Sequence, residues 1–306
     1  RAETCTPTAE TSDTSNVCTL GTGYTDTAGN TGPAASSANY IVDGVDPVIT
    51  TVSLSDSAMI TGDTPTLTIV FSEAVAAFAN ADVTAPAGTL STLASSDSIT
   101  WTATFTPTVN TEDAANTIDI AASYTDVAGT TGPTGSSANY KVETQAPSVS
   151  SITFADTTLI EGETSLVTIV FSEAVAAFTN DDFTIVNGAL STVADSGDAT
   201  TWTATYTPTA ETSDTTNVLT IGTGYTDTAG NAGAAGTSAN YIVDGVDPTM
   251  TISSSTVSSG TTTNDATIAL TFTSSESTTD FIEGDITLSG GSLSSFSGSG
   301  VTYTAT

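Results

Sequence analysis

Histidine is absent from the 306 residues, and Lys and Arg together number only 2, against 34 Asp and Glu. The formal net charge is therefore −32. Nucleic-acid binding depends on Lys and Arg that neutralise phosphates, and anionic membrane surfaces attract the same residues. The composition therefore argues strongly against both kinds of partner. Carboxylates at this density repel one another unless cations lie among them.

Cysteine is nearly absent too, and both copies, Cys5 and Cys18, lie in the first 47 residues. A cross-strand disulfide and two buried free thiols both fit the sequence. Neither cysteine is a candidate nucleophile, because there is no His to activate a thiolate. No run of about 18 apolar residues is present, so we expect no transmembrane helix. No signal peptide begins the sequence.

What the sequence does contain is a repeat. FSEAV occurs at residues 71–75 and 171–175, and TWTAT occurs at 100–104 and 201–205. YTD-x-AG and SANY-x-V each occur three times with the same spacing of 100 to 101 residues. This period is far longer than a solenoid unit and equals the length of one small domain. The sequence therefore predicts a tandem array of one domain type.

The repeat divides the chain into two complete domains and two halves. We predict domains at 48–147 and 148–248. Residues 1–47 match the second half of a repeat, and residues 249–306 match the first half. Each half would be completed by a neighbouring copy of the chain or by a covalently linked neighbouring repeat, and the sequence leaves both alternatives open.

Alternation of apolar and polar residues dominates each repeat. In PTLTIVF (65–71), Leu67, Ile69 and Phe71 fall on one face, and TWTATFT (100–106) behaves in the same way. Gly, Pro, Asn, Asp and Ser fill the gaps, and AVAAF (74–78) is too short for a stable helix. About seven such strands per repeat predict an all-β fold of antiparallel β-sandwiches, with Trp101 and Trp202 in the cores.

The last segment, residues 249–306, is the most diverged and is rich in Ser and Gly. Such a composition is compatible with a flexible tail. We favour true strands, because Thr287–Leu288 and Val301–Thr304 keep the apolar pattern of the repeat.

The combined motifs resemble a known family. SEAV, then G-x-LS, TWTAT-x-TPT, YTD-x-AGN and SANY-x-VD resemble the bacterial Ig-like tandem repeats of large RTX-type and biofilm-associated surface adhesins, over essentially all of the chain. The resemblance implies tandem Ig-like sandwiches in an elongated array, an extracellular location at the bacterial cell surface, calcium at the domain junctions and a mechanical role in cell adhesion and biofilm.

Repeated acidic residues lie where an Ig topology would bring them together. The turn after the second strand, the last hairpin and the incoming linker all meet at one pole of such a sandwich. Oxygen ligands without His or thiolate favour calcium. We predict ligands at the first junction (Asp43, Asp46, Glu73, Asp126), at the second (Glu143, Glu173, Asp227, Asn231) and at the third (Asp244, Asp247, Glu276, with Asp26 and Asn30 of another copy).

Turn formation is the alternative explanation for these residues, since Asp, Asn and Gly favour turns without any ion. Asp82, Asp182 and Asp285 form a separate repeated set that would either bind an ion within a domain or cap a turn. Paired carboxylates such as Asp181–Asp182 sit in a repeated position rather than in a unique cleft, and no phosphate-binding loop is present. We therefore expect no enzyme.

The sequence thus predicts an extracellular, calcium-stiffened string of Ig-like domains that serves as an adhesin stalk or surface filament. Its partner would be itself, head to tail, by strand complementation or through neighbouring repeats. The alternative function is a module that binds a glycan or matrix surface, and a lattice protein of the S-layer type is a third. A concave site lined by exposed aromatics would favour the glycan-binding module.

Overall fold

The computed structural model describes residues 3–9 and 11–306. Regular structure in these residues consists of β-strands and three short 3₁₀ turns: η1 (Asn80–Asp82), η2 (Asn180–Asp182) and η3 (Glu283–Asp285). The chain divides into two compact units, which are described separately. Unit 1 comprises residues 1–148, 173–178 and 223–234, and unit 2 comprises residues 149–172, 179–222 and 235–306. The predicted domain boundaries stay predictions, because these units are not the repeats.

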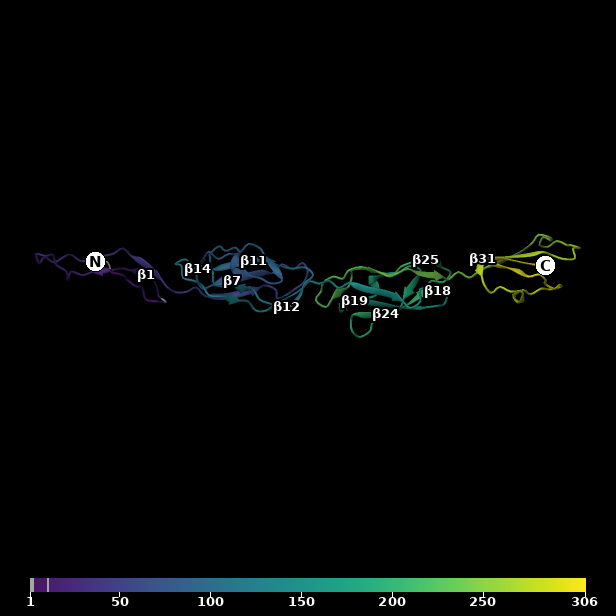
Figure 1. Cartoon of the computed structure of the whole chain (residues 1–306), viewed down its shortest axis with the longest axis horizontal. Coiled ribbons are helices and arrows are strands. Elements are labelled where there is room, and N and C mark those ends of the chain that lie inside the picture. Colours follow the sequence, from purple (N-terminus) through teal and green to yellow (C-terminus); the bar gives the residue numbers. More distant parts are fainter. Residues whose placement is uncertain (1–2, 10) are drawn as a thin grey trace. The chain divides into compact units, whose positions relative to one another are not determined.

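In unit 1, residues 48–148 form two layers of strands. One layer is an antiparallel sheet in the order β10–β11–β7–β5, and β7 and β11 lie side by side in the blue part of Figure 1. Its strands are β5 (Ile49–Leu54), β7 (Thr66–Phe71), β10 (Gly88–Leu90) and β11 (Thr100–Pro107). The other layer contains β6 (Ala58–Met59), β8 (Val75–Ala76), β9 (Val83–Thr84), β12 (Glu112–Asn116), β13 (Asp119–Ile120), β14 (Thr125–Asp126), β15 (Gly135–Ser136) and β16 (Tyr140–Glu143).

Alternating apolar residues explain how these layers form one core. Leu67 and Ile69 of β7 are fully buried, and they belong to the same apolar cluster as Phe105 of β11 and Tyr140 and Val142 of β16. The other residues of these strands are mostly Thr, a β-branched residue suited to the solvent face of a sheet. The two-layer β-sandwich that the sequence predicts is therefore confirmed.

One pairing departs from the predicted antiparallel order. Strand β6 pairs with β16 in parallel, with Ala58 opposite Lys141. After Leu54 the chain leaves the sheet that contains β5 and crosses to the other layer, where it runs beside the closing strand in the same direction. Strand β18 (Thr158–Ile160) pairs with β29 (Tyr241–Asp244) in the same way in unit 2.

Unit 2 repeats this arrangement. Its main sheet has the order β17–β19–β24–β22, with β23 on β24. These strands are β17 (Val149–Phe154), β19 (Ser165–Phe171), β22 (Gly188–Leu190), β23 (Ala194–Asp195) and β24 (Thr201–Pro208). The shorter strands are β21 (Phe183–Thr184), β25 (Ser213–Asn217), β26 (Thr220–Ile221) and β28 (Gly236–Thr237). Strands β20 (Val175–Ala176) and β27 (Thr226–Asp227) pair with each other in unit 1.

The two predicted half-domains each form part of a sandwich. Residues 3–47 contain β1 (Ser12–Asn16), which pairs with β4 (Tyr40–Asp43), and β2 (Thr19–Leu20), which pairs with β3 (Ala35–Ser36). Residues 249–306 contain one sheet, β30 (Met250–Ser254), β31 (Leu270–Thr278) and β32 (Ser297–Ala305). The prediction of true strands is thus confirmed for Val301–Thr304. Thr287–Leu288 lies outside a strand.

A tyrosine closes the same hairpin in every copy. Tyr124 donates a hydrogen bond from its hydroxyl to the Pro133 carbonyl at 2.9 Å, and Tyr24 donates to the Pro33 carbonyl at 2.8 Å. A Cβ on Gly132 would lie 2.1 Å from the Tyr124 ring, so glycine is required where the ring covers the backbone. The Tyr of the YTD motif therefore closes the hairpin, and the Asp of the motif supplies a carboxylate.

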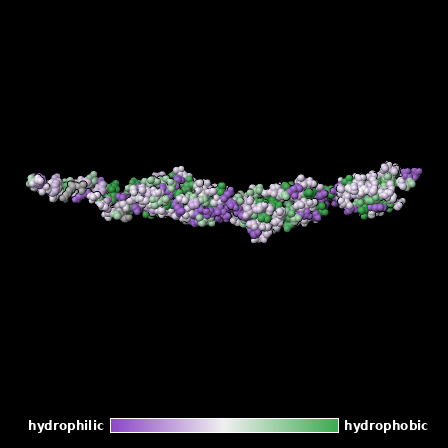
Figure 2. Space-filling model, in the orientation of Figure 1, coloured by the Kyte–Doolittle hydropathy of each residue, from purple (hydrophilic) through white to green (hydrophobic). Residues whose placement is uncertain are grey.

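Two further expectations concern single residues. Trp101 is partly buried and packs edge-on against Phe78, with ring centroids 5.3 Å apart, which confirms its packing role. Cys5 and Cys18 are both exposed and free, so neither of the two alternatives, a cross-strand disulfide or two buried free thiols, is found in this structure. Pale, weakly hydrophilic residues cover much of the visible surface in Figure 2, as Thr and Ser on the solvent faces of strands would produce.

Candidate metal centres

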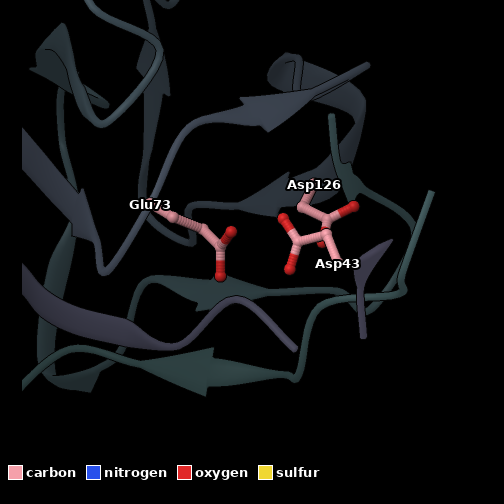
Figure 3. A group of neighbouring side chains, drawn as sticks. All are labelled: Asp43, Glu73 and Asp126. Carbon is pink, nitrogen blue, oxygen red and sulfur yellow. The ribbon is translucent and has the colours of Figure 1, made fainter. Parts of the chain in front are cut away.

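Three carboxylates from separate parts of the sequence meet in unit 1. Asp43 ends β4, Glu73 follows β7 and Asp126 ends β14. One carboxylate oxygen from each lies within 4.8 Å of the others, and Figure 3 shows the three side chains directed towards a common space. Asp126 is buried, and the other two are partly buried. The predicted convergence of linker, turn and hairpin is found here.

The hairpin after β14 holds the Asp126 carboxylate in place through hydrogen bonds. Its Oδ1 accepts hydrogen bonds from the backbone N–H groups of Gly129 at 2.6 Å and Thr130 at 2.9 Å, and its Oδ2 accepts one from the Thr130 hydroxyl. Gly129 has a φ of 100°, which favours glycine. Burial raises the pKa of Asp126, but these hydrogen bonds together outweigh it and hold the pKa below its usual value. Asp126 therefore stays ionised.

The charges of this group are not balanced by hydrogen bonds alone. Burial, and then the nearby carboxylates of Asp43 and Asp126, raise the pKa of Glu73. The Oδ1 atom of Asp43 is buried and has no hydrogen-bond partner. A buried carboxylate oxygen without a donor is costly, because it has lost its hydration and gained nothing in return. A cation bound among the three carboxylates would remove this cost.

An equivalent group lies elsewhere in unit 1. It consists of Glu143 at the end of β16, Asp227 at the end of β27, and Glu173. One carboxylate oxygen from each lies within 4.8 Å of the others. Burial raises the pKa of both glutamates, and for Glu173 the charges of Asp227, Glu143 and Glu112 act in the same direction. Oε1 of Glu173 is buried without a hydrogen-bond partner. The unpartnered oxygen thus recurs in the second group, on a different residue.

Asn231 organises this second group. Its Nδ2 donates to the Glu143 carbonyl at 2.9 Å and to Oδ2 of Asp227 at 2.8 Å, while its Oδ1 accepts the Thr61 N–H at 2.9 Å. In this arrangement Asn231 orients the carboxylates, and its role as a ligand stays a prediction. Sequence reasoning missed Thr61, whose hydroxyl also donates to the Thr144 carbonyl at 3.1 Å. Thr61 is recognised only by its position in a loop that faces Asn231. The repeat pattern does not indicate this contact.

The third predicted group is not assembled within the described part of the chain. No set of three there unites Asp244 with Glu276. Asp247 instead lies with Glu161 and Glu211, and all three are exposed. Asp46 is exposed and lies outside the first group. Asp26 accepts hydrogen bonds from Asn30 within its own exposed hairpin, so the roles of Asp26 and Asn30 as ligands for another copy stay predictions.

The separate set of repeated aspartates caps turns. Oδ2 of Asp82 accepts the Ala79 N–H at 2.8 Å across η1, Asp182 accepts the Thr179 N–H at 2.8 Å, and Asp285 accepts the Ile282 N–H at 2.9 Å. Of the two alternatives for these residues, the hydrogen bonds therefore favour capping.

The two groups that contain a buried aspartate offer the type of ligand that calcium binds, carboxylate oxygen. Calcium takes oxygen ligands at about 2.4 Å, so two oxygens that share one ion are at most about 4.8 Å apart. Both groups meet this limit, both offer only oxygen, and both contain an oxygen that lacks a donor. Asp43, Glu73 and Asp126 would hold one ion and Glu143, Glu173 and Asp227 another. The carboxylates of Glu161, Glu211 and Asp247 are all exposed, so water can solvate them without an ion.

Comparison with known proteins agrees with this architecture. A family model described as bacterial Ig-like domain matches residues 43–142, 143–243 and 244–306. Such domains are typically repeats of bacterial surface proteins and are structural rather than enzymatic. No curated protein matches the chain. Within residues 3–9 and 11–306, no helix is both long enough and apolar enough for a membrane span. The three matched segments cover most of the sequence, and the chain belongs to the bacterial Ig-like domain family.

Proposed function

We propose that this chain is an extracellular structural protein, a row of Ig-like domains stiffened by calcium, which serves as the stalk of an adhesin or as a cell-surface filament. One observation supports this proposal above the others. Two complete repeats each carry a three-carboxylate group at the same place, and each group contains a buried oxygen without a donor.

The position of the groups gives calcium its mechanical effect. Asp43 and Glu143 end strands β4 and β16, directly before the linkers that enter the two complete repeats, whereas the other carboxylates belong to the repeats themselves. An ion shared by such a strand end and the following repeat restrains the linker between them. Loss of the ion leaves three carboxylates that repel one another at the same point. The linkers are therefore stiff when calcium is bound and loose when it is removed.

The charge of the chain is consistent with an environment rich in calcium. Extracellular modules bind calcium at roughly 10⁻⁴–10⁻³ M, which suits surface proteins. Ions that bind only the folded, docked form also stabilise it by mass action. Neighbouring chains or repeats are the partners of such an array, and a host or matrix surface would be bound by other parts of it.

The glycan-binding alternative has less support. In the complete repeats the tyrosines are buried (Tyr124, Tyr140, Tyr206, Tyr225 and Tyr241), and Trp101 and Trp202 are partly buried. A binding platform for a sugar needs exposed rings. Tyr24 and Tyr40 are exposed, but their counterparts in the complete repeats, Tyr124 and Tyr140, are buried, so both are core positions of the repeat rather than a binding platform.

Calcium titration by calorimetry, paired with small-angle scattering, tests the proposal. Asp126→Asn and Asp227→Asn should each weaken one site by about 10-fold or more, because each removes a ligand charge. Asp181→Asn, which removes the same charge from an exposed position outside the groups, should leave both sites intact. Scattering should show a longer maximum dimension in calcium than in chelator. If no heat of binding is seen, or if all three variants behave alike, the proposal fails.

A further inference from the structure

Asn187 and Gly188 form the only Asn–Gly pair in the sequence. Asparagine followed by glycine is the pair most prone to deamidation, because glycine has no side chain to hinder attack of its backbone nitrogen on the asparagine amide. In the other complete repeat the position of Asn187 is taken by Ala87, and both residues have a φ of 55°. The backbone therefore takes the same turn with alanine as with asparagine.

The side-chain amide of Asn187 is held by two hydrogen bonds. Its Nδ2 donates to Oδ2 of Asp214 at 3.0 Å and to Oδ1 of Asn217 at 2.7 Å. Asn217 is fully buried, and its own Nδ2 donates to the carbonyls of Asp214 at 2.8 Å and Tyr241 at 3.2 Å. The Asn187 amide thus supplies a donor both to a carboxylate and to a buried amide oxygen.

The backbone of the pair is fixed as well. The Asn187 carbonyl accepts hydrogen bonds from the Thr209 N–H at 2.9 Å and from the Tyr206 hydroxyl at 2.8 Å. A Cβ on Gly188 would lie 2.4 Å from the same hydroxyl oxygen, so the Tyr206 side chain covers the glycine. Attack on the amide requires the Gly188 nitrogen to turn towards Cγ of Asn187, and this rotation breaks the hydrogen bonds of the Asn187 carbonyl. The folded repeat therefore blocks the reaction.

We propose that Asn187 is a deamidation site that is closed in the folded repeat and opens when the repeat unfolds, so that unfolding leaves a permanent chemical mark. The Gly188 nitrogen attacks Cγ of Asn187, the Cγ–Nδ2 bond breaks, and ammonia leaves with the proton of the Gly188 N–H. Water then opens the resulting succinimide at one of its two carbonyls and gives aspartate or isoaspartate. The reaction consumes only water and needs no enzyme.

The product does not fit the folded repeat. Hydrogen bonds from the backbone and side chain of Thr216, and a further one from Asn187, outweigh burial and hold the pKa of Asp214 below its usual value. Asp214 is therefore ionised. An aspartate at position 187 places a second negative charge where Asp214 now accepts a hydrogen bond, and it removes a donor from the buried Oδ1 of Asn217. Both changes destabilise the folded state. Isoaspartate also lengthens the backbone directly before β22.

The other complete repeat has no such pair. Ala87 stands in place of Asn187, and Phe105 in place of Tyr206. Residues 48–147 can therefore unfold and refold without this change, whereas residues 148–248 keep a record of having unfolded. The inference is independent of calcium and of the proposed function, because every contact that supports it lies within residues 187–241.

Peptide mass spectrometry of the 306-residue chain tests the site. The chain is kept in one mildly alkaline buffer with and without guanidinium chloride, and the deamidated fraction of Asn187 is followed over time. Deamidation should be at least about 100-fold slower in the folded chain, because only the small unfolded fraction reacts. Asn180, which precedes Asp181, is the internal control and should react more slowly than Asn187 in denaturant. Equal rates for Asn187 with and without denaturant, or no excess over Asn180 in denaturant, overturn the proposal.

Two variants test the effect of the product on the fold. Asn187→Ala carries the residue of the other complete repeat, and Asn187→Asp carries the charge of the product. The urea midpoint should be lower for Asn187→Asp, because both variants lose the amide donors and only this one brings a charge to Asp214. Addition of Asp214→Asn to Asn187→Asp should raise the midpoint again, since it removes the facing charge. If Asn187→Asp and Asn187→Ala unfold at the same urea concentration, or if Asp214→Asn gives no recovery, the product does not oppose refolding and this part of the proposal is wrong.

Discussion

At the scale of single residues, aspartates have two roles that cannot be told apart in the sequence: some only cap a turn, and others also belong to a carboxylate group. Asp126 and Asp227 accept backbone N–H groups of their own hairpins and also face other carboxylates. Asp97 accepts the N–H groups of Ile99 at 2.9 Å and Thr100 at 2.8 Å and belongs to no such group. The two roles differ in whether a second and a third carboxylate lie nearby, and only the folded structure brings these carboxylates together.

Asp97 gives a prediction about pH. Hydrogen bonds from the backbone of Thr100 and Ile99 hold the pKa of Asp97 below its usual value. A group whose pKa is lowered on folding stabilises the folded state above its unfolded pKa, and this stability is lost as the pH falls through the folded pKa. Asp97→Ala should therefore lower Tm at pH 7, and the difference should shrink towards pH 2. Thermal melts at both pH values check this, with Asp181→Asn as the control. A difference that is equal at pH 7 and pH 2 contradicts the assignment.

Asn231 shows the limit of inference from residue type. An amide oxygen in a repeated hairpin is a reasonable calcium ligand, yet here that oxygen accepts the Thr61 N–H and the amide nitrogen faces the carboxylates. The sequence contains no sign of this, because residue 61 is threonine in one repeat and its counterpart is Glu161 in the next. The grouping of Asp247 with Glu161 and Glu211 has the same cause. The positions equivalent to these two glutamates are not acidic in the preceding repeat, so the repeat pattern does not predict the group.

At the scale of elements, the strands follow the apolar alternation closely, since one face of each sheet is buried and a shift by one residue would expose it. The cross-over of β6 to the other layer could not be predicted in the same way. Ala58 and Met59 form a strand of only two residues, too short for a periodic pattern. The convergence of the first two carboxylate groups could be predicted because each carboxylate lies at or just after a strand end, where an Ig topology fixes its neighbours.

Strand β10 shows how closely a side chain of the neighbouring strand β11 covers its backbone. A Cβ on Gly88 would lie 2.1 Å from the Phe105 ring, which is fully buried. Gly88→Ala should therefore displace that ring and destabilise the domain by about 1–3 kcal/mol, the usual cost of overpacking. Gly21→Ala is the matched control, because a Cβ there meets nothing within 4 Å. Urea denaturation of both variants measures the difference. Equal midpoints would mean that the Phe105 ring is free to move aside.

At the scale of the whole molecule, the net charge of −32 sets the conditions for stability. Repulsion between exposed carboxylates is screened by salt, whereas buried pairs are screened much less. Two contributions are therefore expected, one that any salt relieves and one that only a bound cation relieves.

The two contributions predict a specific response to chelation. Removing calcium at low ionic strength should lower Tm, and 0.5 M NaCl should restore only part of the loss, because sodium screens the surface but does not replace a divalent ion among three carboxylates. In a chain with both Asp126→Asn and Asp227→Asn, chelation should have a smaller effect than in the natural chain. Calorimetric melts of the two proteins give the comparison. Full recovery in NaCl would leave screening as the whole explanation.

The tyrosine hairpin has one more consequence. The Tyr24 hydroxyl donates to the Pro33 carbonyl nine positions later, and the Gly32 N–H donates to the Tyr24 carbonyl at 2.9 Å, so both hydrogen bonds lie within the hairpin itself. Contacts so near in sequence form quickly and need no distant strand. The closing half of each domain can thus take its hairpin shape as soon as it is synthesised, and what remains is its packing onto the opening half, which precedes it in the chain.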